Sequence, residues 1–148
     1  MSRKHRINVK QKGNRWELAV SKFLVQCGYP YARRSSYAQS RQGEKLPDVI
    51  GTPFWVECKA YRQVTAGSIR LWMSECIKKR DRRPIVLFVK DGVAIRRGRG
   101  KGAGCTFWCF RDESWQQVEQ FPMTVEAWRA RWGEAPAMVP EDEQEVPF

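Results

Sequence analysis

The fold is decided by one stretch, PDVIGTPFWVECK at residues 47–59. Its centre, Gly-Thr-Pro at 51–53, is rich in turn formers, and apolar residues lie on both sides of it. The pattern predicts a β-hairpin, with Asp48 at the end of one strand and residues 54–59 forming the next. Side chains alternate between the two faces of a strand. One face of the second strand then carries Phe54, Val56 and Cys58, and the other carries Trp55, Glu57 and Lys59.

This hairpin brings two carboxylates and an ammonium close together. Glu57 and Lys59 share a strand face, and Asp48 lies close to them across the turn. Carboxylate oxygens are the ligands that Mg²⁺ prefers, and an ammonium can stabilise a phosphate beside the metal. The stretch therefore predicts a site for a divalent cation and a phosphate.

Length, composition and cysteine usage describe one globular domain. The chain has 148 residues and is 42% hydrophobic, which suits a single domain with a modest core. No apolar run approaches the roughly 18 residues of a membrane span, and no apolar segment follows the basic N-terminus, so neither a membrane protein nor a secreted one is expected. Five cysteines, an odd number, fit a reducing cytoplasmic compartment. The chain has no CxxC pair and only His5, so no zinc site is expected.

The net charge of +11 is unevenly distributed along the chain. Residues 1–111 contain 25 Lys and Arg against 7 Asp and Glu, whereas residues 112–148 contain 2 against 9. A body with a charge of +18 indicates a polyanionic partner, most plausibly nucleic acid, although solubility alone is the alternative interpretation. Three of the seven acidic residues in the basic part are Glu17, Asp48 and Glu57.

The remaining elements are predicted from hydrophobic periodicity and helix or turn signals. The order of elements predicts an α/β fold with a mixed β-sheet flanked by helices. Within the first helix, Glu17 lies at the edge of the apolar stripe. The elements are a disordered basic arm at 1–11, a helix at 12–27, a strand at 29–35, a loop at 36–46, a helix with Ser68 as N-cap and ending at Lys78-Lys79-Arg80, a buried strand at 84–90, a Gly/Arg-rich loop at 91–104, a strand at 105–110, a short helix at 114–120, a helix at 124–132 and an acidic disordered tail at 134–148.

Several short motifs together resemble the PD-(D/E)xK nuclease superfamily. They are Lys12-Gly13-x-x-x-Glu17, Gly28-Tyr29, Arg34-Ser35, Pro47-Asp48-Val49 and Val56-Glu57-Cys58-Lys59, and the resemblance covers about residues 12–118. Within the superfamily they are most similar to archaeal-type Holliday junction resolvases and small related phage enzymes. The resemblance implies a restriction-endonuclease-like nuclease domain at 12–133, Mg²⁺ as cofactor with Mn²⁺ as substitute, and a homodimer that cuts four-way DNA junctions symmetrically.

The resemblance also implies roles for individual residues. Glu17, Asp48 and Glu57 match the glutamate, aspartate and second glutamate that bind divalent metal in the family. Lys59 matches the catalytic lysine. Ser35 matches a serine with a role near the active site, and Ser36 is the alternative for that role.

Candidate DNA contacts follow from positive charge. The segment Arg96-Arg97-Gly98-Arg99-Gly100-Lys101-Gly102 is densely cationic and suited to a phosphate backbone, while a solvated loop is the alternative. Tryptophans 16, 72, 128 and 132 are expected in the core, and Trp55 is left open because it shares the face of Glu57. The candidate DNA-binding residues are Lys10, Lys12, Arg33, Arg34, Arg41, Arg96, Arg97, Arg99 and Lys101.

The function expected from these features is a magnesium-dependent, structure-selective DNA endonuclease, with a Holliday junction resolvase as the leading candidate. Such an enzyme would work in the cytoplasm of a bacterial, archaeal or phage-infected cell. Two alternatives stay open at this point. One is a nuclease of the same fold that acts on other branched, nicked or linear DNA. The other is a nucleic-acid-binding protein without catalytic activity, whose carboxylates are structural.

Overall fold

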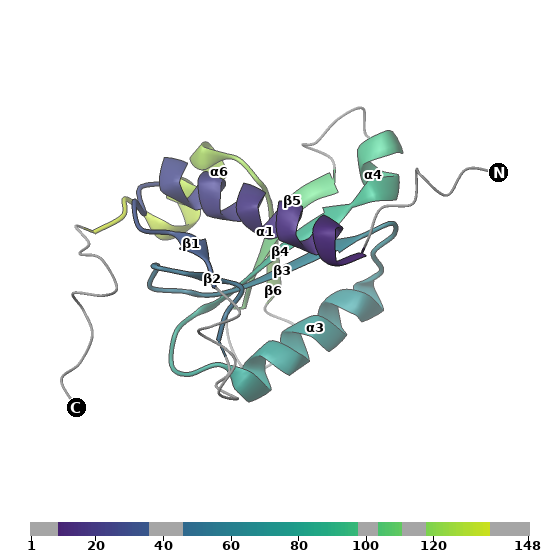
Figure 1. The fold of residues 1–148 in the computed structure, drawn as a ribbon, viewed down its shortest axis with the longest axis horizontal. Helices are drawn as coiled ribbons and strands as arrows, with labels where there is room; N and C mark the ends of the chain where they lie inside the picture. Colours follow the sequence, from purple (N-terminus) through teal and green to yellow (C-terminus); the bar gives the residue numbers. More distant parts are fainter. Residues whose placement is uncertain (1–8, 36–45, 98–103, 111–117, 137–148) are drawn as a thin grey trace.

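A six-stranded mixed sheet lies between helices in the computed structural model, which describes residues 9–35, 46–97, 104–110 and 118–136 (Figure 1). This confirms the predicted α/β fold with a mixed sheet flanked by helices. The strands are β1 (Arg33–Arg34), β2 (Val49–Ile50), β3 (Trp55–Tyr61), β4 (Ile85–Asp91), β5 (Cys105–Phe110) and β6 (Val118–Pro122), and the helices are α1 (Val9–Gln26), α3 (Ala66–Lys79), α4 (Gly92–Arg97) and α6 (Val125–Trp132).

The strands follow one another across the sheet in chain order, β1-β2-β3-β4-β5-β6. Every neighbouring pair is antiparallel except β3 and β4, which are parallel. A parallel pair needs a crossover, and α3 supplies it. Helices α1 and α6 lie on one face of the sheet and α3 lies on the other (Figure 1).

The central strand β4 is buried on both faces, as the unbroken apolar run Ile-Val-Leu-Phe-Val predicted. Val86 and Phe88 pack on the side of α1 and α6, and the alternate residues pack on the side of α3. Trp128 of α6 is fully buried against aromatic rings from both the helices and the sheet. Its indole N–H donates to the hydroxyl of Tyr29 at 3.3 Å, which ties α6 to the end of α1.

The predicted hairpin is present. Strands β2 and β3 are antiparallel, with Val49 opposite Val56. Asp48 directly precedes β2, and its N–H extends the pairing by donating to the carbonyl of Val56 at 2.8 Å. Gly51 has a φ of 84°, and a Cβ there would overlap the carbonyl of Tyr31. Only glycine fits this turn.

The first half of the chain departs from the predicted boundaries in three places. Helix α1 begins at Val9, so residues 9–11 are helical and do not belong to a disordered arm. The strand predicted at 29–35 is limited to β1. The N-cap of α3 is Thr65, because its hydroxyl accepts from the N–H of Ser68 at 3.1 Å, and Ser68 is the third helical residue of a capping box.

Two further predictions, in the second half of the chain, are wrong. Residues 92–97 form α4 where a loop was predicted, because the carboxylate of Asp91 accepts from the N–H groups of Val93 and Ala94 at 3.0 Å each and so caps a helical turn. Residues 118–120 were predicted to be helical but belong to β6, where pairing with β5 overrides local preference. The strand at 105–110 and the helix at 124–132, capped by Thr124 and Gly133, are confirmed.

Some predictions fall on residues outside the described part of the chain. They concern the basic arm at 1–8, most of the loop at 36–46, the glycine-rich run at 98–103, residues 111–117 and most of the acidic tail. Among the described residues, none of the helices has the length and apolar character that crossing a membrane requires.

Candidate active site

Three carboxylates from separate elements act on one another at the start of the hairpin. Glu17 comes from α1, Asp48 immediately precedes β2, and Glu57 is in β3. Burial, followed by the negative charges of Glu57 and, less strongly, Glu17, raises the pKa of Asp48 from its ordinary 3.8 to about 7. Asp48 is therefore the carboxylate on which the negative charges of the other two act.

Backbone hydrogen bonds on two sides fix the position of Asp48. Its Oδ2 accepts from the N–H of Cys58 in β3 at 2.8 Å, and its carbonyl accepts from the N–H of Ser35 at 3.0 Å. The bond from Cys58 favours the ionised carboxylate, but it only partly offsets burial and repulsion. The candidate Ser35 thus touches the site through its backbone.

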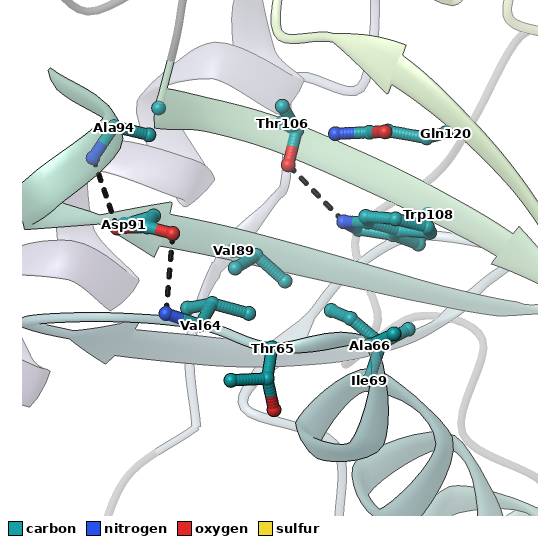
Figure 2. A pocket seen from close by; sticks show the side chains of 11 residues that line it. Val64, Thr65, Ala66, Ile69, Val89, Asp91, Ala94, Thr106, Trp108 and Gln120 are labelled. Atoms are coloured by element: carbon teal, nitrogen blue, oxygen red, sulfur yellow. Dashed lines mark hydrogen bonds between the residues drawn. The ribbon is translucent and has the colours of Figure 1, made fainter. Parts of the chain in front are cut away.

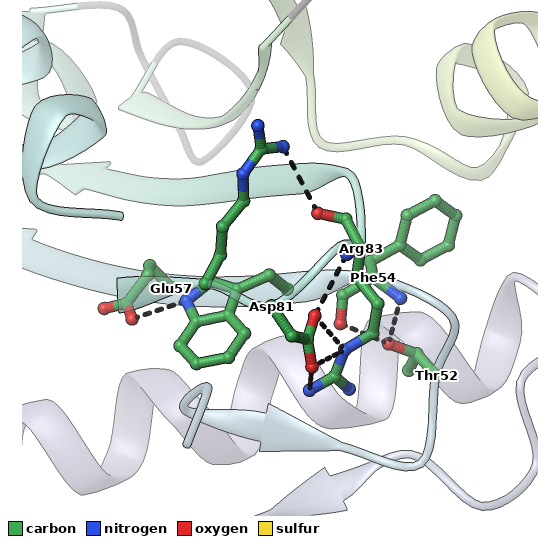
Figure 3. A network of polar contacts seen from close by, with 7 residues as sticks. Thr52, Phe54, Glu57, Asp81 and Arg83 are labelled. Carbon is green, nitrogen blue, oxygen red and sulfur yellow. Dashed lines mark hydrogen bonds and ion pairs between the residues drawn. The ribbon is translucent and has the colours of Figure 1, made fainter. Parts of the chain in front are cut away.

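Glu57 is the most deeply buried of the three carboxylates, with 2% of the residue exposed. Its Oε1 accepts from the indole N–H of Trp55 at 3.1 Å (Figure 3) and lies 2.9 Å from the ammonium of Lys79 at the end of α3. Burial alone would lower the pKa of Lys79, but the hydrogen bond and charge of Glu57 outweigh it, so this pKa is raised. Sequence reasoning assigned Lys79 only to the helix end and missed this contact.

Trp55 is a supporting residue of the core. Its side chain is almost fully buried, and the guanidinium of Arg83 lies 5.4 Å from its ring centroid. Arg83 is held in turn by an ion pair with Asp81 at 2.9 Å (Figure 3). The indole is therefore fixed in the orientation that donates to Glu57, and its buried ring is not available to a nucleic-acid base.

Lys59 lies on the α3 side of β3, on the same face as Trp55 and Glu57, as the alternation predicted. Its ammonium is 5.8 Å from the ring centroid of Trp72 in α3, a cation–π contact. Cys58, between Glu57 and Lys59, packs against the core on the opposite face. The ammonium of Lys59 therefore lies over Trp72 on this face of the sheet, and the ion pair with Glu57 is made by Lys79.

Glu17 is engaged with a cation of its own. Its Oε1 lies 3.2 Å from Nε of Arg34, and Nη2 of Arg34 also donates to Asn14 at 2.9 Å. Arg34 is a predicted DNA contact, and its guanidinium lies against Glu17 and Asn14 of α1 in this structure. The negative charge of Glu17 therefore acts on Asp48, but its carboxylate is held in an ion pair with Arg34 of β1.

The carboxylates of the site decide whether a divalent cation fits. In the part of the chain that the structure describes, no three His, Cys, Asp or Glu side chains form a cluster able to hold a metal ion. Asp48 and Glu57 remain as two neighbouring carboxylates, of which Asp48 has a cost of ionisation that a cation would relieve. Mg²⁺ takes oxygen ligands and keeps several waters, so one or two carboxylates suffice. The donor chemistry fits Mg²⁺ with Asp48 and Glu57, and Glu17 is not a ready third ligand.

The other DNA-binding candidates are spread over several places. Arg33 in β1 is half-buried and donates to the carbonyl of Tyr31 at 3.4 Å. Arg96 and Arg97 are exposed at the end of α4. The remaining predictions concern side chains outside the described part, namely those of Lys10, Lys12, Ser36, Arg41, Arg99 and Lys101.

A cavity of about 220 Å³ lies elsewhere, between the start of α3 and strands β4 and β5 (Figure 2). Asp91, Thr106 and Trp108 are among its lining residues, and none of the three site carboxylates is. The carboxylate of Asp91 accepts from the N–H of Val64 at 3.1 Å and caps α4. This acid is therefore satisfied by backbone groups and serves the fold.

The hairpin and α3 thus bring together Asp48, Glu57 and Lys79. Lys59 shares the strand face of Glu57 but contacts Trp72, and Glu17 acts on Asp48 through its negative charge. No family model matches this chain, and neither a curated protein nor a solved structure matches it. The geometry of the hairpin is therefore what any functional assignment must rest on.

Proposed function

We propose that this chain is a magnesium-dependent endonuclease that hydrolyses phosphodiester bonds in branched DNA, in the manner of the PD-(D/E)xK nucleases that its motifs resemble. The observation that carries the proposal is geometric: Asp48 Oδ2 accepts from the N–H of Cys58 at 2.8 Å, and Cys58 directly follows the buried Glu57 in β3. Burial and the charges of Glu57 and Glu17 raise the pKa of Asp48 in this position. Carboxylates held together at such a cost are typical of sites where a cation or a proton completes the charge balance.

In this proposal Asp48 and Glu57 would hold Mg²⁺, with the carbonyl of Cys58 as a further oxygen. When bound, the metal supplies charge neutralisation at the phosphate and a water of lowered pKa. Trp55 orients the carboxylate of Glu57 through its indole N–H. Lys59, whose ammonium lies 5.8 Å from the ring centroid of Trp72, stabilises the negative charge that develops on the phosphoryl oxygens.

The charge distribution supports DNA as the substrate. Residues 1–111 carry a net charge of +18, and Arg96 and Arg97 are exposed at the end of α4. Such a body binds a phosphate backbone with strong salt dependence. Symmetric cutting of a four-way junction needs two active sites, so a homodimer is part of the proposal and can be checked by light scattering with and without DNA.

A second candidate function is favoured by one specific observation. Two of the three carboxylates are already paired, Glu17 with Arg34 and Glu57 with Lys79. Paired carboxylates of this kind also occur in proteins where they serve the fold alone. The second candidate is therefore a nucleic-acid-binding protein without catalytic activity.

One experiment separates the two candidates. Asp48→Asn, Glu57→Gln and the control Glu75→Gln, which removes an exposed acid from α3, are compared with the wild type for cleavage and binding of a four-way junction with Mg²⁺. The enzyme proposal expects both site variants to bind but not cut, and the control to cut normally. A wild-type chain that cuts no DNA with Mg²⁺ or Mn²⁺ leaves only the binding protein.

The substrate is decided by a parallel comparison of four-way, flap, nicked and linear duplexes. Paired symmetric nicks confined to the four-way form indicate a resolvase. Cleavage of the other forms at similar rates indicates a nuclease of the same fold with a broader substrate range.

A further inference from the structure

The contact between Lys79 and Glu57 is the feature of the site that the proposed mechanism does not use. Glu57 is a carboxylate with 2% exposure, and an ionised group in such a place requires a partner of opposite charge. The ammonium of Lys79, 2.9 Å from Oε1, is that partner. A divalent cation bound to Glu57 would perform the same neutralisation.

Lys79 also acts on the second carboxylate. Its positive charge favours the ionised form of Asp48, against the repulsion from Glu57. One ammonium thus serves the same two carboxylates that would hold the metal. Its side chain, 34% exposed, reaches Glu57 from the last turn of α3.

Because of this placement, a divalent cation and the ammonium of Lys79 compete for the same carboxylates. A cation that enters beside Asp48 and Glu57 meets an ammonium already in contact with one of them, and like charges at short range in a partly dry site repel strongly. By contrast, the pair of Glu17 and Arg34 lies at the α1 side and is more open to solvent, with side-chain exposures of 23% and 37%. Solvent and salt screen the charge of Arg34 more than that of Lys79, so Arg34 affects metal binding less.

We propose that the ammonium of Lys79 is the counter-ion of Glu57 in the metal-free protein. A divalent cation must displace this ammonium in order to bind beside Glu57. This inference rests on the proposed metal site and adds a residue that tunes it. Lys79 is a positioning residue here, since it acts through Glu57. It keeps the fold stable while no metal is bound and lowers the affinity of the site for metal.

The test measures Mn²⁺ binding to the DNA-free protein by electron paramagnetic resonance, so no cleavage is needed. Lys79→Met removes the charge and keeps the length of the chain, Lys79→Arg keeps the charge, and Lys78→Met is the matched control on an exposed neighbour. Changes in groups that contact a metal ligand alter metal affinity by about 10- to 100-fold. The expected result is Mn²⁺ binding tighter by that factor in Lys79→Met, with the other two variants close to wild type.

A double-mutant cycle tests the counter-ion role without metal. Lys79→Met should lower the urea midpoint of the metal-free protein, and adding Glu57→Gln should restore it, because the uncharged amide needs no ammonium. Should Lys79→Met fold too poorly for metal titration, this restoration by Glu57→Gln still decides the counter-ion role. Independent, additive effects of the two substitutions would overturn the inference.

The failures of the two ideas are distinguishable. If the wild type binds Mn²⁺ and Lys79→Met binds it equally or more weakly, the competition is refuted while the proposed enzyme stands. If neither protein binds Mn²⁺, the proposed metal site is itself wrong, and the inference falls with it.

Discussion

The substitution Asp48→Asn should stabilise the metal-free protein at alkaline pH. The pKa of Asp48 is raised from 3.8 to about 7, with burial as the largest cause. A carboxyl whose pKa is higher in the folded state than in the unfolded state does not destabilise the fold at a pH below its unfolded-state pKa. The free energy of unfolding falls as pH rises from the unfolded-state pKa to the folded-state pKa, where the carboxyl of the folded protein ionises. Above pH 7 the folded protein holds an ionised carboxylate that the unfolded chain accommodates at lower cost.

The magnitude follows from the two pKa values. A pKa difference of one unit corresponds to about 1.4 kcal/mol, so the ionised Asp48 costs the folded state up to about 4 kcal/mol at about pH 8. Asparagine cannot ionise, and its amide oxygen can still accept from the N–H of Cys58. Because that bond is weaker to a neutral acceptor, we expect a net gain of about 2 to 4 kcal/mol at about pH 8 and close to none at about pH 4.

The assay is urea denaturation followed by tryptophan fluorescence, with a chelator present, across this pH window. Asp81→Asn is the control, because Arg83 holds the pKa of Asp81 below its usual range and that substitution removes a favourable ion pair. Added Mg²⁺ should stabilise the wild type and not Asp48→Asn. The reasoning is refuted if Asp48→Asn is no more stable than wild type at about pH 8, or if the difference between them does not change with pH.

Three further predictions test other parts of the molecule. Lys59→Ala should lower the single-turnover cleavage rate by about 10²- to 10³-fold while DNA affinity changes little, and normal cutting would remove Lys59 from the mechanism. Gly51→Ala should lower the free energy of unfolding by more than about 2 kcal/mol, because φ is positive and a Cβ would meet the Tyr31 carbonyl. Gly13→Ala is the control: it lies in open space on α1 and should raise the free energy of unfolding by about 0.5–1 kcal/mol, and equal effects of the two substitutions would contradict this account of the turn. Replacing Arg96 and Arg97 by Gln should flatten the salt dependence of DNA binding, by about 0.9 in log–log slope for each phosphate that the variant no longer neutralises, and an unchanged slope would place DNA elsewhere.

The hairpin shows how far local sequence reaches. Alternation along residues 54–59 predicted correctly which side chains share a face, because a strand has a period of two whatever surrounds it. The unbroken apolar run of β4 and the cap residues of α6 were equally readable. Each of these features depends on neighbours within a few positions in the chain.

The errors fall where a distant partner decides the structure. Residues 118–120 form a strand because they pair with the edge of β5, and the sequence of the segment itself does not indicate this pairing. Residues 92–97 form a helix because Asp91 caps it while also accepting from Val64 across the crossover. Short segments have weak intrinsic preferences, and tertiary contacts override them.

The candidate site divides in the same way. The sequence by itself determined the hairpin, the face shared by Glu57 and Lys59, and the scarcity of acid elsewhere in a basic body. Only the tertiary structure decided that Glu57 is buried and paired with Lys79, because the β3-α3-β4 crossover returns the end of α3 to the strand that carries Glu57. Charge pairs across such a crossover depend on how a whole helix packs on a sheet, and that packing has no signature in the spacing of the residues concerned.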